Sequence, residues 1–147
     1  MNQEDHKKVA VECFNKTWDL IDKEDRTIDE TLEMIRLAQT SRYHWGIAGD
    51  YVNWSRGDWQ IAHAYAKAGN GEQSLIYAQS NERIHQQYGL TGFDEVFVYE
   101  ALGRAYKLLG DEVQVEQALV KAKALTEKLE NEKDRSYLGS QLKELAK

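Results

Sequence analysis

The chain has 147 residues, a formal net charge of −6 and a single cysteine, Cys13. This is the size of one domain, large enough to bury an apolar core without a disulfide or a metal. The acidic balance argues against nucleic acid as a partner, because nucleic-acid binders usually present a basic face. No apolar run reaches the length of about 20 residues that spans a bilayer, and the polar start MNQEDHKKVA does not resemble a signal peptide. We therefore expect a cytoplasmic protein with no membrane contact.

The amino-acid composition predicts an all-helical fold. The chain contains no proline, whereas average usage of about 5% predicts about seven in a chain of this length. Charged residues make up 30% of the sequence, and runs of β-branched residues are few. Proline breaks helices and β-branched residues favour strands, so this composition favours helices joined by short connections.

Apolar residues spaced three and four positions apart, together with capping signals, mark the first three predicted helices. The first covers about 4–24. A capping box at Thr27 and Glu30 begins the second, which is expected to end near Tyr43 because Gly46 and Gly49 follow. Asp50 is the expected N-cap of the third. The residues expected to face the core are Ala10, Val11, Phe14, Trp18 and Ile21, then Ile28, Leu32, Ile35 and Ala38, then Trp54, Ile61 and Tyr65 with Tyr51 at the edge.

Four further helices are predicted in the second half of the chain. They cover about 72–88 before Gly89, 94–109 before Gly110, a stretch beginning at Asp111, and about 132–146. Short connections leave consecutive helices little choice but to pack antiparallel. We therefore expect one all-α domain with hairpins at about 4–45, 50–88 and 94–130, followed by a capping helix at about 132–146.

An interval of 41 residues relates the three predicted hairpins. A fixed interval between similar residues indicates stacked copies of one structural unit. The matching sets are Leu20 with Ile61 and Leu102, Trp18 with Trp59, Tyr65 with Tyr106, and Gly69 with Gly110.

The third hairpin resembles a tetratricopeptide repeat. Its large-aromatic, leucine, small, tyrosine and turn positions are occupied by Tyr99, Leu102, Gly103, Tyr106 and Gly110-Asp111, and its second helix matches through Leu119 and Ala122. The middle hairpin matches at Ile61, Ala62, Tyr65, Gly69 and Ser74. It departs from the motif at Asp58, which stands at the large-aromatic position, and the interval exceeds the usual length of about 34 residues. The segments HWG, RGDWQIAHAYA and VYEALGRAY also resemble a group of small bacterial helical-repeat proteins.

The resemblance implies a tetratricopeptide-like stack in which the first helix of each hairpin lines a concave groove. Its ligand-facing positions correspond here to Arg56, Trp59 and His63 in the middle hairpin and to Phe97, Glu100 and Arg104 in the third. The 41-residue offset adds Asn15, Trp18 and Asp22. At 100° per residue, Trp59 and His63 lie on the side of their helix away from Trp54. The alternative is that these two residues pack against neighbouring helices.

The sequence contains no catalytic motif that we can identify. We interpret Cys13 as a small core residue, and His44, His63, Asp50, Asp58 and Glu100 lack the spacings of metal ligands. We therefore expect no cofactor, no metal and no enzymatic activity. The expected function is a non-enzymatic module that binds a protein or peptide in the groove. Two alternatives stay open: a small-molecule sensor or enzyme with a pocket at His63, Glu100 and Arg104, and a scaffold that forms homodimers or larger homo-oligomers.

Overall fold

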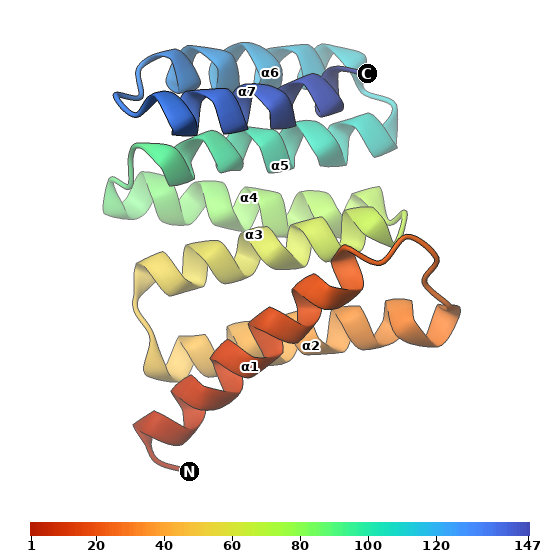
Figure 1. Ribbon diagram of the computed structural model, residues 1–147, viewed down its shortest axis with the longest axis vertical. Coiled ribbons are helices and arrows are strands. Elements are labelled where there is room, and N and C mark those ends of the chain that lie inside the picture. Colours follow the sequence, from red (N-terminus) through yellow and green to blue (C-terminus); the bar gives the residue numbers. More distant parts are fainter.

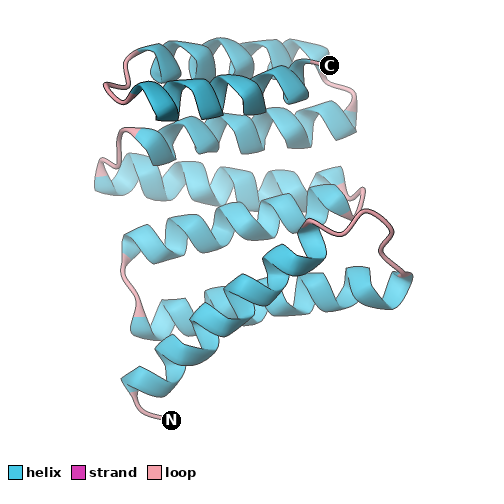
Figure 2. Ribbon diagram, viewed as in Figure 1, coloured by secondary structure: helices cyan, strands magenta, loops and turns pink.

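Seven α-helices and no strand make up the computed structural model, which describes residues 1–147 (Figure 2). The helices are α1 (Gln3–Ile21), α2 (Ile28–Ala48), α3 (Tyr51–Lys67), α4 (Gly71–Tyr88), α5 (Phe93–Leu109), α6 (Glu112–Glu127) and α7 (Glu132–Ala146). Figure 1 shows α2 to α6 stacked in chain order, with α1 crossing α2 obliquely, α7 lying against α5 and α6, and the two termini at opposite ends of the stack. The predicted all-α class is confirmed.

Neighbouring helices pack in pairs, and the pairs form a curved stack. The helices α1 and α2, α3 and α4, and α5 and α6 form three hairpins. The helix α1 also contacts α3, α3 contacts α5, and α5 contacts α7, whereas α2, α4 and α6 do not pack against one another. The odd-numbered helices are therefore closer together than the even-numbered ones, which places them on the inside of the curve.

The helix ends follow the capping signals in the sequence. Thr27 accepts the Glu30 N–H and Glu30 accepts the Thr27 N–H, which confirms the predicted capping box. Asp50 is the N-cap of α3, as predicted, and Asp111, where a helix was predicted to begin, is the N-cap of α6; both accept backbone N–H groups. The helix α4 ends at Gly89, which adopts the left-handed conformation with a φ of 63°. These caps fix the short connections that hold each hairpin antiparallel.

The helix α2 extends further than the sequence predicts, to Ala48 rather than to about Tyr43. Gly46 remains helical, because one glycine costs a helix only about 1 kcal/mol. The chain leaves the helix at Gly49, whose N–H bonds to the Trp45 carbonyl. The Trp54 indole donates to the same carbonyl across 3.0 Å, so the end of α2 is tied to α3.

The core runs through the stack as three apolar clusters. The first joins α1, α2 and α3 through Ile21, Met34, Ala38, Ile61 and Ala64. The second joins the four helices α3, α4, α5 and α6, and the third joins α5, α6 and α7. The first two clusters each include side chains from two hairpins, and the third joins the last hairpin to α7, so the hairpins and α7 stabilise one another.

The predicted core face of α2 is wrong at Ile28 and Leu32 and correct at Ala38. Ile28 is 83% exposed and Leu32 is 47% exposed, whereas Met34, Ala38 and Ser41 are buried. Besides Met34, the buried face carries the small residues Ala38 and Ser41, and Ser41 donates a hydrogen bond to the Ala10 carbonyl of α1 across 2.8 Å. Ile28 and Leu32 therefore do not mark the core face of α2. Val11, on α1, is also exposed rather than buried.

Asp58, which stands where the repeat motif has a large aromatic residue, is buried in a polar network. Its carboxylate accepts from Arg42 Nε at 2.9 Å and from Ser80 Oγ at 2.6 Å. The adjacent Gly57 makes room for this arginine, since a Cβ atom there would lie 2.8 Å from Arg42 Cδ. An ion pair thus joins α2, α3 and α4 where an aromatic side chain would otherwise fill the space.

Candidate functional site

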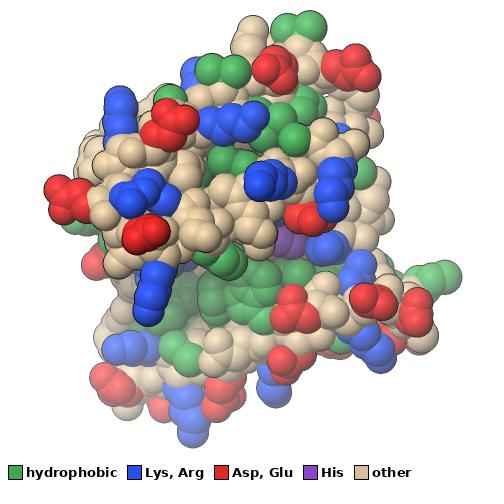
Figure 3. All heavy atoms as spheres, turned by 45° about the horizontal axis from the view of Figure 1, so that its top comes forward, with side chains coloured by type: hydrophobic (Ala, Val, Ile, Leu, Met, Phe, Trp, Pro, Cys, Tyr) green, Lys and Arg blue, Asp and Glu red, His purple; other side chains and the backbone are tan.

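A cavity of about 330 Å³ opens on the inner side of the stack, between α1, α3, α5 and α7. Six of its ten lining residues are aromatic. The lining consists of Phe14, Trp18, Ser55, Arg56, Trp59, Asn81, Phe93, Asp94, Phe97 and Tyr137. Figure 3 shows hydrophobic side chains gathered in a hollow that charged side chains surround.

A second cavity of about 270 Å³ adjoins the first and is more polar. Its polar and charged residues are Asp22, His63, Lys67, Arg104 and Gln141. The two cavities share Trp18, Trp59, Phe97 and Tyr137. We call the two cavities together the groove, the first being its apolar half and the second its polar half.

The aromatic residues of the groove form a continuous chain of contacts across the odd-numbered helices. The ring centroids of Trp18 and Trp59 are 5.4 Å apart, and those of Trp59 and Phe97 are 5.2 Å apart. Phe93 meets Phe97 at 5.2 Å and stacks on Tyr137 at 6.5 Å. Edge-to-face and offset pairs of this kind are favourable and hold each ring in one orientation. The wall of the groove is therefore largely preformed.

A buried ion pair lies behind this aromatic wall. Glu100 is 2% exposed, and its carboxylate pairs with the Arg104 guanidinium one helical turn away. The Trp59 indole donates to Glu100 Oε1 across 3.3 Å. Arg104 Nη1 lies 2.7 Å from His63 Nδ1. Because arginine can only donate, Nδ1 is the unprotonated nitrogen and His63 carries its proton on Nε2.

The electrostatics of this cluster keep His63 neutral. Burial lowers the pKa of His63 well below its ordinary value of 6.5, and the positive charges of Arg104, Lys67 and Arg26 lower it further. Burial also lowers the pKa of Arg104 to about 10, so the guanidinium stays protonated at neutral pH. The cluster therefore holds one full positive charge against one full negative charge, with a neutral imidazole beside them.

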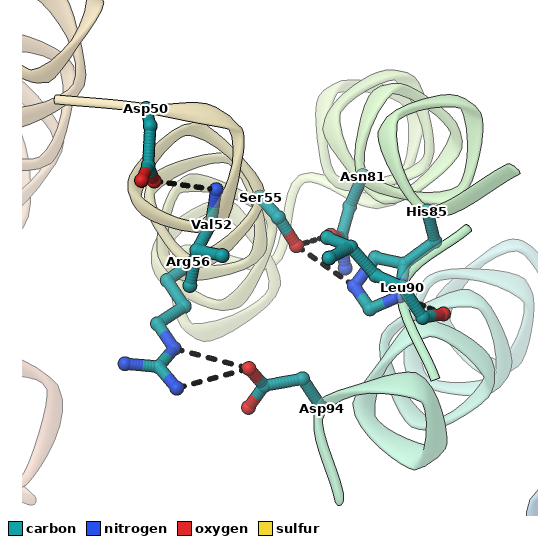
Figure 4. Close-up of polar contacts among 8 residues, drawn as sticks. All are labelled: Asp50, Val52, Ser55, Arg56, Asn81, His85, Leu90 and Asp94. Carbon is teal, nitrogen blue, oxygen red and sulfur yellow. Dashed lines mark hydrogen bonds and ion pairs between the residues drawn. The ribbon is translucent and has the colours of Figure 1, made fainter. Parts of the chain in front are cut away.

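An exposed ion pair lies at the rim of the apolar half. Arg56 Nε and Nη2 both donate to Asp94 Oδ2, at 3.2 and 3.0 Å (Figure 4). The Arg56 side chain is 59% exposed, so water screens this pair and the contact is weak. A ligand that offers Arg56 an acceptor could replace Asp94 at little cost.

A buried polar network forms the floor of the apolar half. Ser55 Oγ lies 2.7 Å from Asn81 Oδ1 and 2.8 Å from His85 Nε2, and His85 Nδ1 lies 3.2 Å from the Leu90 carbonyl oxygen (Figure 4). These contacts join α3 to α4 and to the connection that follows α4. Ser55 and Asn81 also line the cavity, so they are the polar groups that a bound molecule would meet there.

The structure brings the six predicted groove residues together on the inner side of the stack. Arg56, Trp59, His63, Phe97 and Arg104 line the cavities. Glu100 is the exception, because it lies buried behind Trp59 and reaches the groove only through its partners. From the first hairpin, Trp18 and Asp22 line the groove and Asn15 does not. The division of the aromatic cluster is confirmed, since Trp54 packs against Tyr88 on the other side of α3.

Several groove residues were not predicted as site residues. Phe93 and Asp94 precede the matched motif positions, and Tyr137 lies on α7, which we expected only to cap the stack. Phe14 was assigned to the core. Ser55 and Asn81 carry no signal in the sequence, because the packing of α3 on α4 alone brings them together. The residues missed are Phe14, Ser55, Asn81, Phe93, Asp94 and Tyr137 in the apolar half, and Ile21, Lys67 and Gln141 in the polar half.

The acidic and histidine residues that we considered as metal ligands are dispersed. His44 contacts His6 with 2.8 Å between their Nδ1 atoms, far along α2 from the groove, and Asp58 pairs with Arg42. No three histidine, cysteine, aspartate or glutamate side chains converge on one point. Burial raises the pKa of the Cys13 thiol, which favours its unreactive protonated form.

Comparison with protein families, with curated proteins and with solved structures finds no match to this chain. None of its helices combines the length and the hydropathy of a membrane span. Function must therefore be inferred from the chemistry of the groove.

Proposed function

We propose that the protein is a non-enzymatic binding module: a cytoplasmic, tetratricopeptide-like stack whose groove holds a peptide or an extended segment of a partner protein. The observation that carries this proposal is the row of aromatic side chains that runs through both halves of the groove, formed by Trp18, Trp59, Phe97 and Tyr137. Rigid aromatic side chains provide most of the binding energy in protein interfaces at little cost in conformational entropy.

The exposure of Tyr137 supports a binding role for this wall. Its side chain belongs to both cavities, yet the residue is 52% exposed. A residue needed only for packing would be covered. Large apolar side chains that stay exposed and are surrounded by charged residues are typical of interaction sites.

The polar residues of the groove favour binding over catalysis. Glu100, Arg104 and His63 bond to one another, and Glu100 also accepts the Trp59 indole. A catalytic acid or base must reach the proton that it transfers, whereas this carboxylate is buried behind a ring. The cluster is suited to holding Trp59 in position, and the aromatic faces are left to contact the ligand.

A random peptide library displayed on phage tests this proposal. Peptides selected on the wild-type protein are measured against Tyr137→Ala and Arg56→Ala, which remove exposed groove side chains and leave the core intact. We expect at least about tenfold weaker binding for Tyr137→Ala, which is the loss of one aromatic contact. Tyr88→Ala is the matched control, because this tyrosine is 41% exposed on α4 outside the groove. If no peptide is selected, or if the selected peptides bind Tyr137→Ala normally, the proposal is wrong.

A second candidate function is self-association through the outer face of α2. Four large apolar residues are exposed there: Ile28, Leu32, Tyr43 and Ile47. They project within about 100° of one another around the helix, so they form one stripe. Sedimentation across a concentration range tests this candidate. A dimer that Leu32→Lys converts to a monomer supports it, and a wild-type protein that stays monomeric at high concentration removes it.

A further inference from the structure

The apolar half of the groove has a polar floor that its aromatic walls do not explain. Asn81 is 1% exposed, and the only hydrogen-bond partner of its side chain is Ser55. One end of its amide therefore has no protein partner, and the residue lines the cavity. The free end is not sealed from solvent, because the only buried side-chain polar atoms without a partner are Arg26 Nε and Gln60 Oε1; in the cavity it can bond to water or to a ligand that replaces the water. This floor is therefore a place where a ligand can gain a hydrogen bond.

The contacts of His85 determine which end of the Asn81 amide faces the cavity. His85 Nδ1 must carry a proton, because it faces the Leu90 carbonyl oxygen at 3.2 Å. The structure places Oδ1 of Asn81 against Ser55 and so leaves the amide nitrogen toward the cavity. If the imidazole is neutral, Nε2 accepts from Ser55, and the amide must be turned round so that its nitrogen donates to Ser55 and its oxygen faces the cavity. If the imidazole is doubly protonated, the order reverses and the amide nitrogen faces the cavity. A hydroxyl group both donates and accepts, so it fits either arrangement.

The walls of the same cavity select a flat ring. Aromatic rings enclose it on several sides, and two of them, Trp59 and Phe97, already meet edge to face. A volume of about 330 Å³ is at the lower end of the range for ligand pockets, which suits one side chain rather than a longer segment. Arg56 and Arg104, which line the two halves of the groove, are each paired with a carboxylate, Asp94 and Glu100, so the groove offers no unpaired charge and suits an uncharged ring.

We propose that the apolar half of the groove holds a tyrosine side chain of the partner peptide, with the ring between Trp59 and Phe93 and the hydroxyl on Asn81. This proposal rests on the proposed function and names the residue that the groove selects. Phenylalanine would fill the same space but leave the Asn81 amide without a partner. A site built to bond a hydroxyl discriminates against the analogue that lacks it.

Peptide pools test this specificity without knowledge of the natural partner. Each pool contains decapeptides of random sequence with one fixed central residue, which is tyrosine, phenylalanine or leucine, and retention on the immobilised protein is measured. We expect the tyrosine pool to bind at least about fivefold more tightly than the phenylalanine pool, the value of one hydrogen bond. The leucine pool, which has no ring, should bind most weakly.

Two variants test whether the preference for tyrosine over phenylalanine depends on the floor of the cavity. Asn81→Leu should bring the tyrosine and phenylalanine pools to nearly equal retention. Ser55→Ala should reduce the preference, because Ser55 orients the amide. Ser74→Ala is its matched control, since Ser74 is equally buried and bonds to the Ala62 carbonyl away from the groove. If Asn81→Leu does not fold, as judged by circular dichroism, the two serine variants decide.

The outcomes separate this proposal from the binding function itself. Equal retention of the tyrosine and phenylalanine pools, with both lost in Tyr137→Ala, overturns the tyrosine site and leaves peptide binding intact. A tyrosine preference that survives in both Asn81→Leu and Ser55→Ala also overturns it. Retention that Tyr137→Ala does not change, or no retention of any pool, contradicts peptide binding in the groove as well.

Discussion

The Trp59 indole donates a hydrogen bond to the Glu100 carboxylate across 3.3 Å, although the two residues are 41 positions apart in the chain. The same separation joins His63 to Arg104 at 2.7 Å and the Arg26 side chain to the Lys67 carbonyl at 3.1 Å. Residues one interval apart on α3 and α5 are thus direct neighbours, and Arg26, in the connection that follows α1, meets the end of α3 in the same way. The interval that relates the hairpins in sequence also determines which side chains meet in the groove.

Removing only one partner of the buried Glu100–Arg104 ion pair should lower the free energy of unfolding strongly. Arg104→Met leaves the Glu100 carboxylate buried without its cation, so we expect a loss of about 3–5 kcal/mol in the free energy of unfolding, measured by urea denaturation. Replacing both residues by methionine should restore most of this loss, because no charge is then buried. Arg56→Ala, which breaks an exposed pair, is the control and should cost less than about 1 kcal/mol. Similar losses of stability for Arg104→Met and Arg56→Ala would show that the Glu100–Arg104 pair is not desolvated.

Protonation of His63 should destabilise the fold in mild acid. The folded protein lowers the pKa of this residue below 6.5 through burial and through Arg104, Lys67 and Arg26. The unfolded chain therefore binds the proton more readily. This contribution is complete above pH 6.5 and is lost as the pH falls below that value, by at most about 1.4 kcal/mol for each pH unit.

Urea denaturation at pH 7.5, 6.5 and 5.5 measures this effect. His63→Gln keeps an acceptor for Arg104 and removes the titration, so its stability should fall less over this range than that of the wild type. His6→Gln provides the control at a histidine outside the groove. If the free energy of unfolding changes equally with pH in the wild type and in His63→Gln, protonation of His63 is not the cause of the destabilisation.

Two helical glycines should respond to alanine in opposite directions. A Cβ atom on Gly103 would lie 2.8 Å from Leu145 Cδ2, so Gly103→Ala pushes on α7 and should cost about 1–3 kcal/mol. Gly139 has no atom within 4 Å of the corresponding position, so Gly139→Ala should stabilise α7 by about 0.5–1 kcal/mol. Thermal unfolding of the two variants measures both effects. A Gly103→Ala protein as stable as Gly139→Ala would mean that α5 and α7 do not approach closely.

The corrected core face of α2 can be tested with two truncations. Met34 is fully buried and Leu32 is 47% exposed, although the sequence analysis places Leu32 in the core and does not include Met34 there. Met34→Ala should cost about 2–5 kcal/mol in the free energy of unfolding. Leu32→Ala should change it by no more than about 0.5 kcal/mol. A larger loss for Leu32→Ala than for Met34→Ala would restore the face that periodicity predicts.

The sequence predicts the helices well because their ends are encoded locally. Thr27 with Glu30, Asp50, Asp111 and Gly89 act within one turn of the chain, so their effect does not depend on the tertiary structure. The face of α2 could not be predicted in the same way. Ala38 is buried as the sequence predicts, but the packing also uses Ser41, which bonds to the Ala10 carbonyl of α1, and hydrophobic periodicity gives no weight to a serine.

Part of the groove could be predicted from the sequence, because some of its residues stand at positions that the repeat fixes. Trp59, His63, Phe97 and Arg104 follow from the repeat register, which fixes the side of each odd-numbered helix that faces inward. Tyr137 could not be predicted from the repeat register, because α7 lies after the third hairpin and has no counterpart in the other hairpins. Asn81 and Ser55 belong to different helices, and only their packing makes them one site.

The most direct test of peptide binding in the groove uses the four tryptophans as internal reporters. Trp18 and Trp59 line the groove, whereas Trp45 and Trp54 do not. Indole N–H signals from ¹⁵N-labelled protein are recorded while a library-selected peptide is added. We predict that the signals of Trp18 and Trp59 shift and saturate together while those of Trp45 and Trp54 stay in place. Shifts confined to Trp45 and Trp54 would contradict the account.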